Sequence, residues 1–257
     1  MEDPPMYGIP DGIAANQREV TAIIDRARTL TTDDWARSVL PGWSVLDMLD
    51  HVARALAQQA EAFERGLRGE LDPPEFPNPQ AATPAKVIDD LVAGLDALQR
   101  ALAKLVPESM AALTPMPFGV IPTPVALQIA VVEYGMHRWD LERACGSPTY
   151  DLSDDVAAAS IAMVPGLLPM LAGRTEQRPA KPAAFQLASP VGAPIVVFDG
   201  EQWAPAEATD IPTTVISGSA SDLTMFYIGR LNASSAGITV AGSQADAEQF
   251  KQYFPGP

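Results

Sequence analysis

Helix-start signals followed by apolar residues at helical spacing predict four long helices in the first two-thirds of the chain. The clearest start is Ser44, a good N-cap residue, with Asp47 at the third helical position to complete a capping box. This signal predicts a helix from about Val45 to Gly66, with His51 in its second turn. Four amphipathic helices favour a helical bundle, whose interior commonly holds metal ligands from facing helices.

The other three helices are placed by similar patterns. Thr83-Pro84 and Thr123-Pro124 each combine an N-cap residue with a proline at the first helical position, where proline is tolerated. The second pair predicts a helix from Pro124 to about Cys145, which ends before a glycine and a nearby proline. An earlier helix should run from about Ile13 to Leu30.

The last third of the chain has a different pattern. Ser153 starts an Ala-rich helix that reaches about Ala172 and is interrupted by two prolines, and a polar stretch then resembles a linker. Beyond it we expect strands at 185–188, 195–198, 213–217 and 237–241, and helices at 221–230 and 244–253. The sequence therefore predicts an α+β protein with a helical bundle at 1–173, a linker at 174–182 and a small α+β domain at 183–257.

The chain has only two histidines, and both lie close to carboxylates. Glu133 and His137 are four residues apart, so they share one helix face with Cβ atoms about 5–6 Å apart. His51 would have to come from a second helix. Two imidazoles and one carboxylate suit Zn²⁺ with an open fourth position, as in catalytic zinc sites. The opposing interpretation makes both histidines surface or hydrogen-bonded core residues and pairs Glu133 with Arg138 or Arg54.

The charge balance narrows the classes of partner. With 32 acidic and 17 basic residues the net charge is −15, so nucleic acid is not expected as a partner. An anionic substrate would need local arginines against this field. No stretch approaches the roughly 20 apolar residues of a membrane span, and the first residues lack a signal peptide's features. Together with the single Cys145, these features predict a cytoplasmic protein without a membrane partner.

Two segments resemble the signature stretches of a known family. Trp43–His51 and Glu133–Leu141 are similar to those of the mycothiol-dependent maleylpyruvate isomerase family, within the DinB-like superfamily of metal-binding four-helix bundles. Val215–Arg230 and Ile238–Gly242 are similar to the sterol-carrier-like C-terminal domain that members carry. The resemblance covers most of the chain and implies a DinB-like bundle followed by a small α+β domain.

The resemblance also implies a chemistry. His51, Glu133 and His137 would be ligands of Zn²⁺ or another divalent metal, which presents mycothiol or another low-molecular-weight thiol as a thiolate. In an isomerase the thiolate adds to a cis double bond, permits rotation and leaves; in an S-transferase it stays attached. The expected partner is a small electrophile, with a carboxylate as one option, and the protein a monomer or homodimer. The alternative is a non-catalytic small-molecule-binding or regulatory protein that retains the bundle.

Five further residues have two interpretations each. Arg54 lies near the face of His51 and could bind a substrate carboxylate or form an ordinary surface ion pair. Arg230 matches a Gly-Arg feature of the family and could reach over the bundle or cap its own helix. Asp47 could orient His51, or it could serve merely as a capping residue. Asp140 could likewise serve merely to brace the end of its helix. Cys145 lies about 12 Å along the helix from the second histidine, which favours an external thiol.

Overall fold

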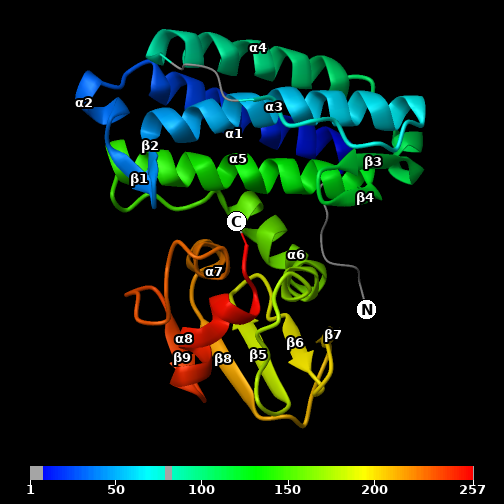
Figure 1. Cartoon of the computed structure of the whole chain (residues 1–257), viewed down its shortest axis with the longest axis vertical. Helices are drawn as coiled ribbons and strands as arrows, with labels where there is room; N and C mark the ends of the chain where they lie inside the picture. The colour runs from blue at the N-terminus through cyan, green and yellow to red at the C-terminus, as the bar shows by residue number, and fades with distance from the viewer. Residues whose placement is uncertain (1–7, 79–82, 257) are drawn as a thin grey trace. The chain divides into compact units, whose positions relative to one another are not determined.

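The computed structural model describes residues 8–78 and 83–256, which form two compact units (Figure 1). The helical unit comprises the described residues up to Tyr150, and the sheet unit begins at Asp151. One unit consists mainly of helices and the other is built around a five-stranded sheet. The predicted α+β class is confirmed.

Four long helices make up most of the helical unit: α1 (Ile9–Ala27), α3 (Val45–Arg68), α4 (Pro84–Leu102) and α5 (Thr123–Cys145). Both α1 and α3 pack against α4 and α5, which closes a ring of four helices (Figure 1). All four helices contribute completely buried apolar residues to the core, among them Val20, Leu56, Leu91 and Leu127. The predicted bundle is confirmed, with helix ends that differ by a few residues.

Helix capping explains where these helices begin. Ser44 and Asp47 form the predicted capping box at α3, and Thr83 caps α4 through its side chain. Thr123 behaves differently from the expectation: it lies inside α5, and its hydroxyl is 2.9 Å from that of Thr114. The Thr-Pro signal therefore marks the start of the helix correctly, although tertiary packing gives the threonine another partner.

Short elements connect the long helices: α2 (Thr32–Trp35), β1 (Ser38–Leu40), β2 (Trp43–Ser44), η1 (Pro107–Ala111), β3 (Leu113–Met116) and β4 (Gly119–Pro122). Two antiparallel hairpins are formed, β1 with β2 and β3 with β4. The first hairpin turns at Gly42, whose φ of 79° favours glycine. Because β2 runs directly into α3, this hairpin holds Trp43 at the start of the helix that carries His51.

The sheet unit contains α6 (Asp154–Ala172), β5 (Ala183–Ala188), β6 (Ile195–Phe198), β7 (Trp203–Ala206), β8 (Thr213–Ser217), α7 (Ala220–Tyr227), β9 (Thr239–Ala241) and α8 (Gln244–Tyr253). The strand order is β7-β6-β5-β8-β9, and only β5 and β8 pair in parallel. Strand β7 was not predicted, since its alternating Trp-Ala-Pro-Ala sequence gives a weak strand signal. Aromatic rings of Phe185, Trp203, Phe250 and Phe254 fill the core of this unit.

Helix α6 belongs to the sheet unit, whereas the sequence analysis placed it in the bundle domain ending at residue 173. It packs against α7, β6 and β7. The hydroxyl of Tyr227 contacts Ser160 of α6, donating to its backbone oxygen at 3.3 Å, and Ser221 accepts a bond from the backbone of Leu152. The stretch 174–182 is therefore a connection inside the sheet unit, and the units meet in sequence near residue 150.

Helix α6 is also long and apolar enough to cross a membrane, with a mean hydropathy of 1.6 over its most apolar window. Half of that window is buried inside the protein. Val156, Val164 and Leu168 are completely buried, while Pro165 and Pro169 lie inside the helix without ending it. A core helix of a soluble domain passes the same test of length and composition, so this is weak support for a membrane span.

Candidate metal centre

Helices α3 and α5 bring the three predicted metal ligands together. His51 Nε2 lies 3.4 Å from Glu133 Oε1, and His137 Nε2 lies 3.2 Å from the same oxygen. One ligand atom of each residue lies within 4.8 Å of the other two. Donor atoms bound about 2.0–2.1 Å from a tetrahedral ion are roughly 3.3 Å apart, so the two distances to Glu133 fit a divalent ion shared by these three side chains.

The alternative partners of Glu133 are engaged elsewhere. Arg138 Nη1 donates to Glu19 at 3.0 Å, and Arg54 Nε donates to Asp50 at 2.8 Å. The sequence had offered both arginines as ion-pair partners of Glu133. Since each pairs with another carboxylate, Glu133 faces the two imidazoles instead.

The electrostatics of the site follow from this arrangement. Burial alone would raise the pKa of Glu133, but hydrogen bonds and charge interactions with His137 and His51 outweigh burial and hold the pKa below its usual range. Burial would lower the pKa of His137, but Asp140 and Glu133 outweigh it and raise the pKa to about 9. Glu133 is therefore ionised at neutral pH, and without a metal ion His137 retains a proton.

Asp140, which the sequence had suggested as merely a brace of its helix end, contacts the second nitrogen of a ligand ring. Its Oδ2 lies 3.3 Å from His137 Nδ1, and both side chains are buried. The Nδ1 group has no aligned hydrogen bond, so the contact is an ion-pair distance only. A carboxylate at this nitrogen orients a metal-binding histidine so that Nε2 faces the ion. The three-residue spacing of His137 and Asp140 was the available signal.

Aromatic rings flank the other histidine. The ring centroid of His51 lies 5.1 Å from Trp43 and 5.5 Å from Phe76. The guanidinium of Arg54 lies 4.7 Å from the centroid of Phe76. Trp43 belonged to the resembling segment, but Phe76 lies in a loop without periodicity, where nothing in the sequence singled it out. These contacts give His51 a partly apolar surrounding, with Phe76 itself 38% exposed.

Two secondary candidates have local structural roles. Asp47 accepts bonds from the backbone and hydroxyl of Ser44, which lower its pKa, and this capping explains its presence. Cys145 ends α5, and burial raises the pKa of its thiol, which therefore stays protonated at neutral pH. The thiol's protonation agrees with the expectation that a reacting thiol comes from outside.

Arg230 lies in the sheet unit, directly after α7. Its backbone N–H donates to Met225 O at 2.7 Å, and Gly229 adopts a φ of 90° in the same turn. The end of the helix therefore requires a glycine at position 229. The backbone N–H of Arg230 takes part in closing the helix end. A substrate role for Arg230 stays a prediction.

Fold and site together define a four-helix-bundle protein with a candidate two-histidine, one-carboxylate metal centre and a C-terminal α+β unit. Residues 17–142 match the family model of the mycothiol maleylpyruvate isomerase N-terminal domain. This match assigns the helical part of the chain, residues 17–142, to that domain family. The predicted family is confirmed.

Solved structures agree with this assignment at the level of the fold. A crystal structure of the mycothiol-dependent maleylpyruvate isomerase is 14% identical in sequence, with a TM-score of 0.68, and the match covers 94% of this chain and 96% of that chain. A histidine-to-alanine mutant of the mycothiol-dependent maleylpyruvate isomerase is 13% identical, with a TM-score of 0.69 and the same coverage. No curated protein matches the sequence significantly.

Proposed function

We propose that this protein is a mycothiol-dependent cis–trans isomerase of the maleylpyruvate type, with its active centre at His51, Glu133 and His137. The observation that carries the proposal is the convergence of these three side chains from two helices, with ligand atoms within 4.8 Å of one another. The match of residues 17–142 to the mycothiol maleylpyruvate isomerase N-terminal domain supports mycothiol as the thiol and isomerisation as the reaction. A pure binding module would have little need for three such ligands.

The donor set is that of a catalytic zinc site, and the ion, when bound, would lower the pKa of a thiol and hold it as a thiolate. The chain's own residues prepare this position. Glu133 supplies a negative charge, because its pKa lies below the usual range. Asp140 at Nδ1 of His137 directs Nε2 toward the ion. Zn²⁺ is the proposed metal, and another divalent ion is the alternative.

Arginines supply the charge that a carboxylate substrate would need in a chain of net charge −15. Arg54 uses Nε for Asp50 and Nη1 for the backbone oxygen of Pro77, which leaves Nη2 without a hydrogen-bond partner among the described residues. We propose Arg54 and Arg230 as substrate-binding residues for a small electrophile with a carboxylate. An S-transferase reaction would use the same metal centre with a substrate that retains the thiol.

The proposal is tested by metal analysis and calorimetry on purified protein. We compare the wild type with a His51→Ala, His137→Ala double variant and with metal-stripped wild type. The wild type should contain about one zinc per chain and bind mycothiol, whereas both other samples should lose mycothiol binding. Maleylpyruvate plus mycothiol then tests turnover, because an isomerase regenerates the free thiol and an S-transferase consumes it.

Three outcomes would contradict parts of the proposal. Unchanged zinc content in the double variant removes the metal site. Mycothiol binding that survives loss of the metal removes the thiolate role of the site. Tight binding of an apolar ligand regardless of metal, without turnover, would support the non-catalytic binding protein instead.

A further inference from the structure

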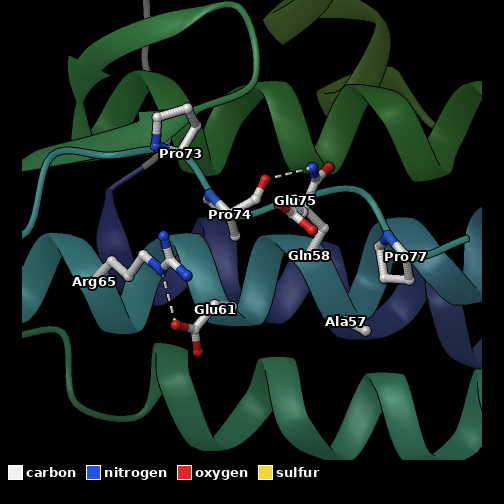
Figure 2. Close-up of a pocket in the computed structure, with 8 residues that line it drawn as sticks. All are labelled: Ala57, Gln58, Glu61, Arg65, Pro73, Pro74, Glu75 and Pro77. Carbon is white, nitrogen blue, oxygen red and sulfur yellow. Dashed lines mark hydrogen bonds and ion pairs between the residues drawn. The ribbon is translucent and has the colours of Figure 1, made fainter.

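A pocket of about 520 Å³ lies between α3 and the loop at residues 72–78, outside the metal site (Figure 2). Helix α3 contributes Ala57, Gln58, Glu61 and Arg65, while the loop contributes Glu75 and three prolines. Figure 2 shows the loop passing beside this helix, with Gln58 reaching from the helix toward Pro74 of the loop. A volume of this size is typical of small-molecule sites.

The loop is attached to α3 by side chains that bond its backbone oxygens. Gln58 Nε2 donates to Pro74 O at 3.0 Å, and Arg65 Nη1 donates to Asp72 O at 3.1 Å (Figure 2 draws the Gln58 bond). Nearer the start of the helix, Arg54 likewise donates to the backbone oxygen of Pro77. Gln58 is 7% exposed, so one polar side chain of the lining is buried. These bonds hold the loop in position and keep the pocket open.

The pocket lies beside the metal site along one face of α3. Gln58 follows His51 by seven residues, which is two helical turns and about 10 Å along the axis. Phe76 stands in the loop between Glu75 and Pro77, two residues that line the pocket, and its ring lies against His51. A molecule bound at His51 could therefore extend past the half-exposed Phe76 into the pocket.

Hydrogen-bond acceptors outnumber donors in this pocket. The three prolines of the loop have no backbone N–H, and Glu61 and Glu75 offer only acceptors when ionised. Arg65 already donates to Glu61 at 2.9 Å and to the backbone of the loop. With two carboxylates and one cation, the lining repels anions and favours a ligand with many hydroxyl or N–H donors. A carboxylate substrate does not suit it.

We propose that this pocket binds the sugar and inositol part of mycothiol while the thiol reaches the metal site. The inference rests on the proposed function, which supplies mycothiol as the cosubstrate. Mycothiol joins an N-acetylcysteine to a glucosamine-inositol unit that is uncharged and rich in hydroxyl groups. Its hydroxyls would donate to Glu61, Glu75 and the loop carbonyls. The electrophilic substrate with its carboxylate would then approach the metal from a side other than this pocket.

The test compares mycothiol with N-acetylcysteine amide, an uncharged compound that carries the same thiol end without the sugar. Zinc-loaded full-length proteins are titrated by calorimetry. Ala57→Phe fills the pocket from an exposed helix position, and Glu75→Ala removes an acceptor from the loop. Ala14→Phe, at an exposed position of α1, is the matched control. Zinc content and melting temperature are measured for each variant.

We expect the wild type and Ala14→Phe to bind mycothiol at least about tenfold more tightly than N-acetylcysteine amide. Ala57→Phe and Glu75→Ala should each lose most of this preference, with unchanged zinc content and unchanged affinity for N-acetylcysteine amide. A preference that survives in both variants would overturn the pocket assignment and leave the proposed function intact. If zinc-loaded wild type binds neither thiol, the proposed function itself fails, and this inference fails with it.

Discussion

Asp140 Oδ2 lies 3.3 Å from Nδ1 of His137, whose other nitrogen lies 3.2 Å from Glu133, so one imidazole is held between two carboxylates. This arrangement makes the ring a stronger ligand and fixes the nitrogen that faces the ion. Among the described residues, no carboxylate contacts the second ring nitrogen of His51, which packs against aromatic rings instead. The two histidines of the site therefore differ in how they are oriented.

Asp140→Asn should weaken zinc binding about 10- to 100-fold, because the side chain keeps its shape but loses the charge that supports His137. The measurement is zinc Kd against a competing chelator, with melting temperature recorded in parallel. Glu142→Gln on the same helix is the control, since Glu142 pairs with Arg26 away from the ligands. Equal zinc affinities for Asp140→Asn and the wild type would show that the contact has no role in metal binding.

Zinc affinity should keep rising with pH through the neutral range. The pKa of His137 without metal is raised to about 9, so below that pH a proton competes with the ion for the imidazole. We expect about a tenfold gain in zinc affinity per pH unit between pH 7 and 8.5. An unshifted histidine would finish titrating near pH 7, so a zinc Kd that is flat above pH 7 contradicts the raised pKa.

Arg54→Lys separates substrate binding from attachment of the loop. Lysine keeps a positive charge near Asp50 but cannot reproduce the planar fork that also reaches Pro77 O and stacks on Phe76. If Arg54 binds the substrate, Arg54→Lys should raise KM for an anionic substrate several-fold. Its melting temperature should stay within about 4 °C of the wild type. A larger loss of stability with unchanged kcat/KM would assign it to the loop alone.

Arg230→Lys should leave zinc content and stability near wild type while lowering kcat/KM for an anionic substrate about tenfold. The backbone of Arg230 and Gly229 already closes α7, so replacing the side chain does not remove the helix cap. The kinetic measurement and thermal unfolding are made on the same preparation. Unchanged kcat/KM would end the proposed role of Arg230 in substrate binding.

Lys251 gives the sheet unit a pH-dependent stability. Burial, followed by the charge of Arg230, lowers its folded-state pKa to about 8, while its ammonium donates to Tyr227 O and Gly256 O. A lowered lysine pKa means that the protonated side chain destabilises the fold. This penalty is complete below pH 8 and disappears as pH rises toward 10.5.

Lys251→Met removes the titrating group, so comparing it with the wild type isolates the pH-dependent contribution of Lys251 to stability. The stability of the wild type relative to the variant should be constant below pH 7.5 and should increase between pH 8 and 10, near the lowered pKa. The measurement is the urea midpoint of unfolding at each pH, taken from the unfolding transition that the substitution shifts. A difference that stays constant over this range, or that falls, would contradict the lowered pKa.

The sequence by itself determined the features that depend on residues a few positions apart. Capping residues and apolar spacing placed α1, α3, α4 and α5 to within a few residues, and α8 matched its predicted ends. The four-residue spacing of Glu133 and His137 put both ligands on one helix face. Each of these features follows from the geometry of a single helix, which local sequence controls.

Only the tertiary structure decided which segments meet. It brought His51 to Glu133 across 82 positions of sequence, joined α6 to the sheet and laid a proline-rich loop over α3 to form a pocket. It also gave Arg54 its partner oxygen on Pro77. Such contacts depend on how buried faces fit together over the whole core, and local periodicity carries no information about that fit.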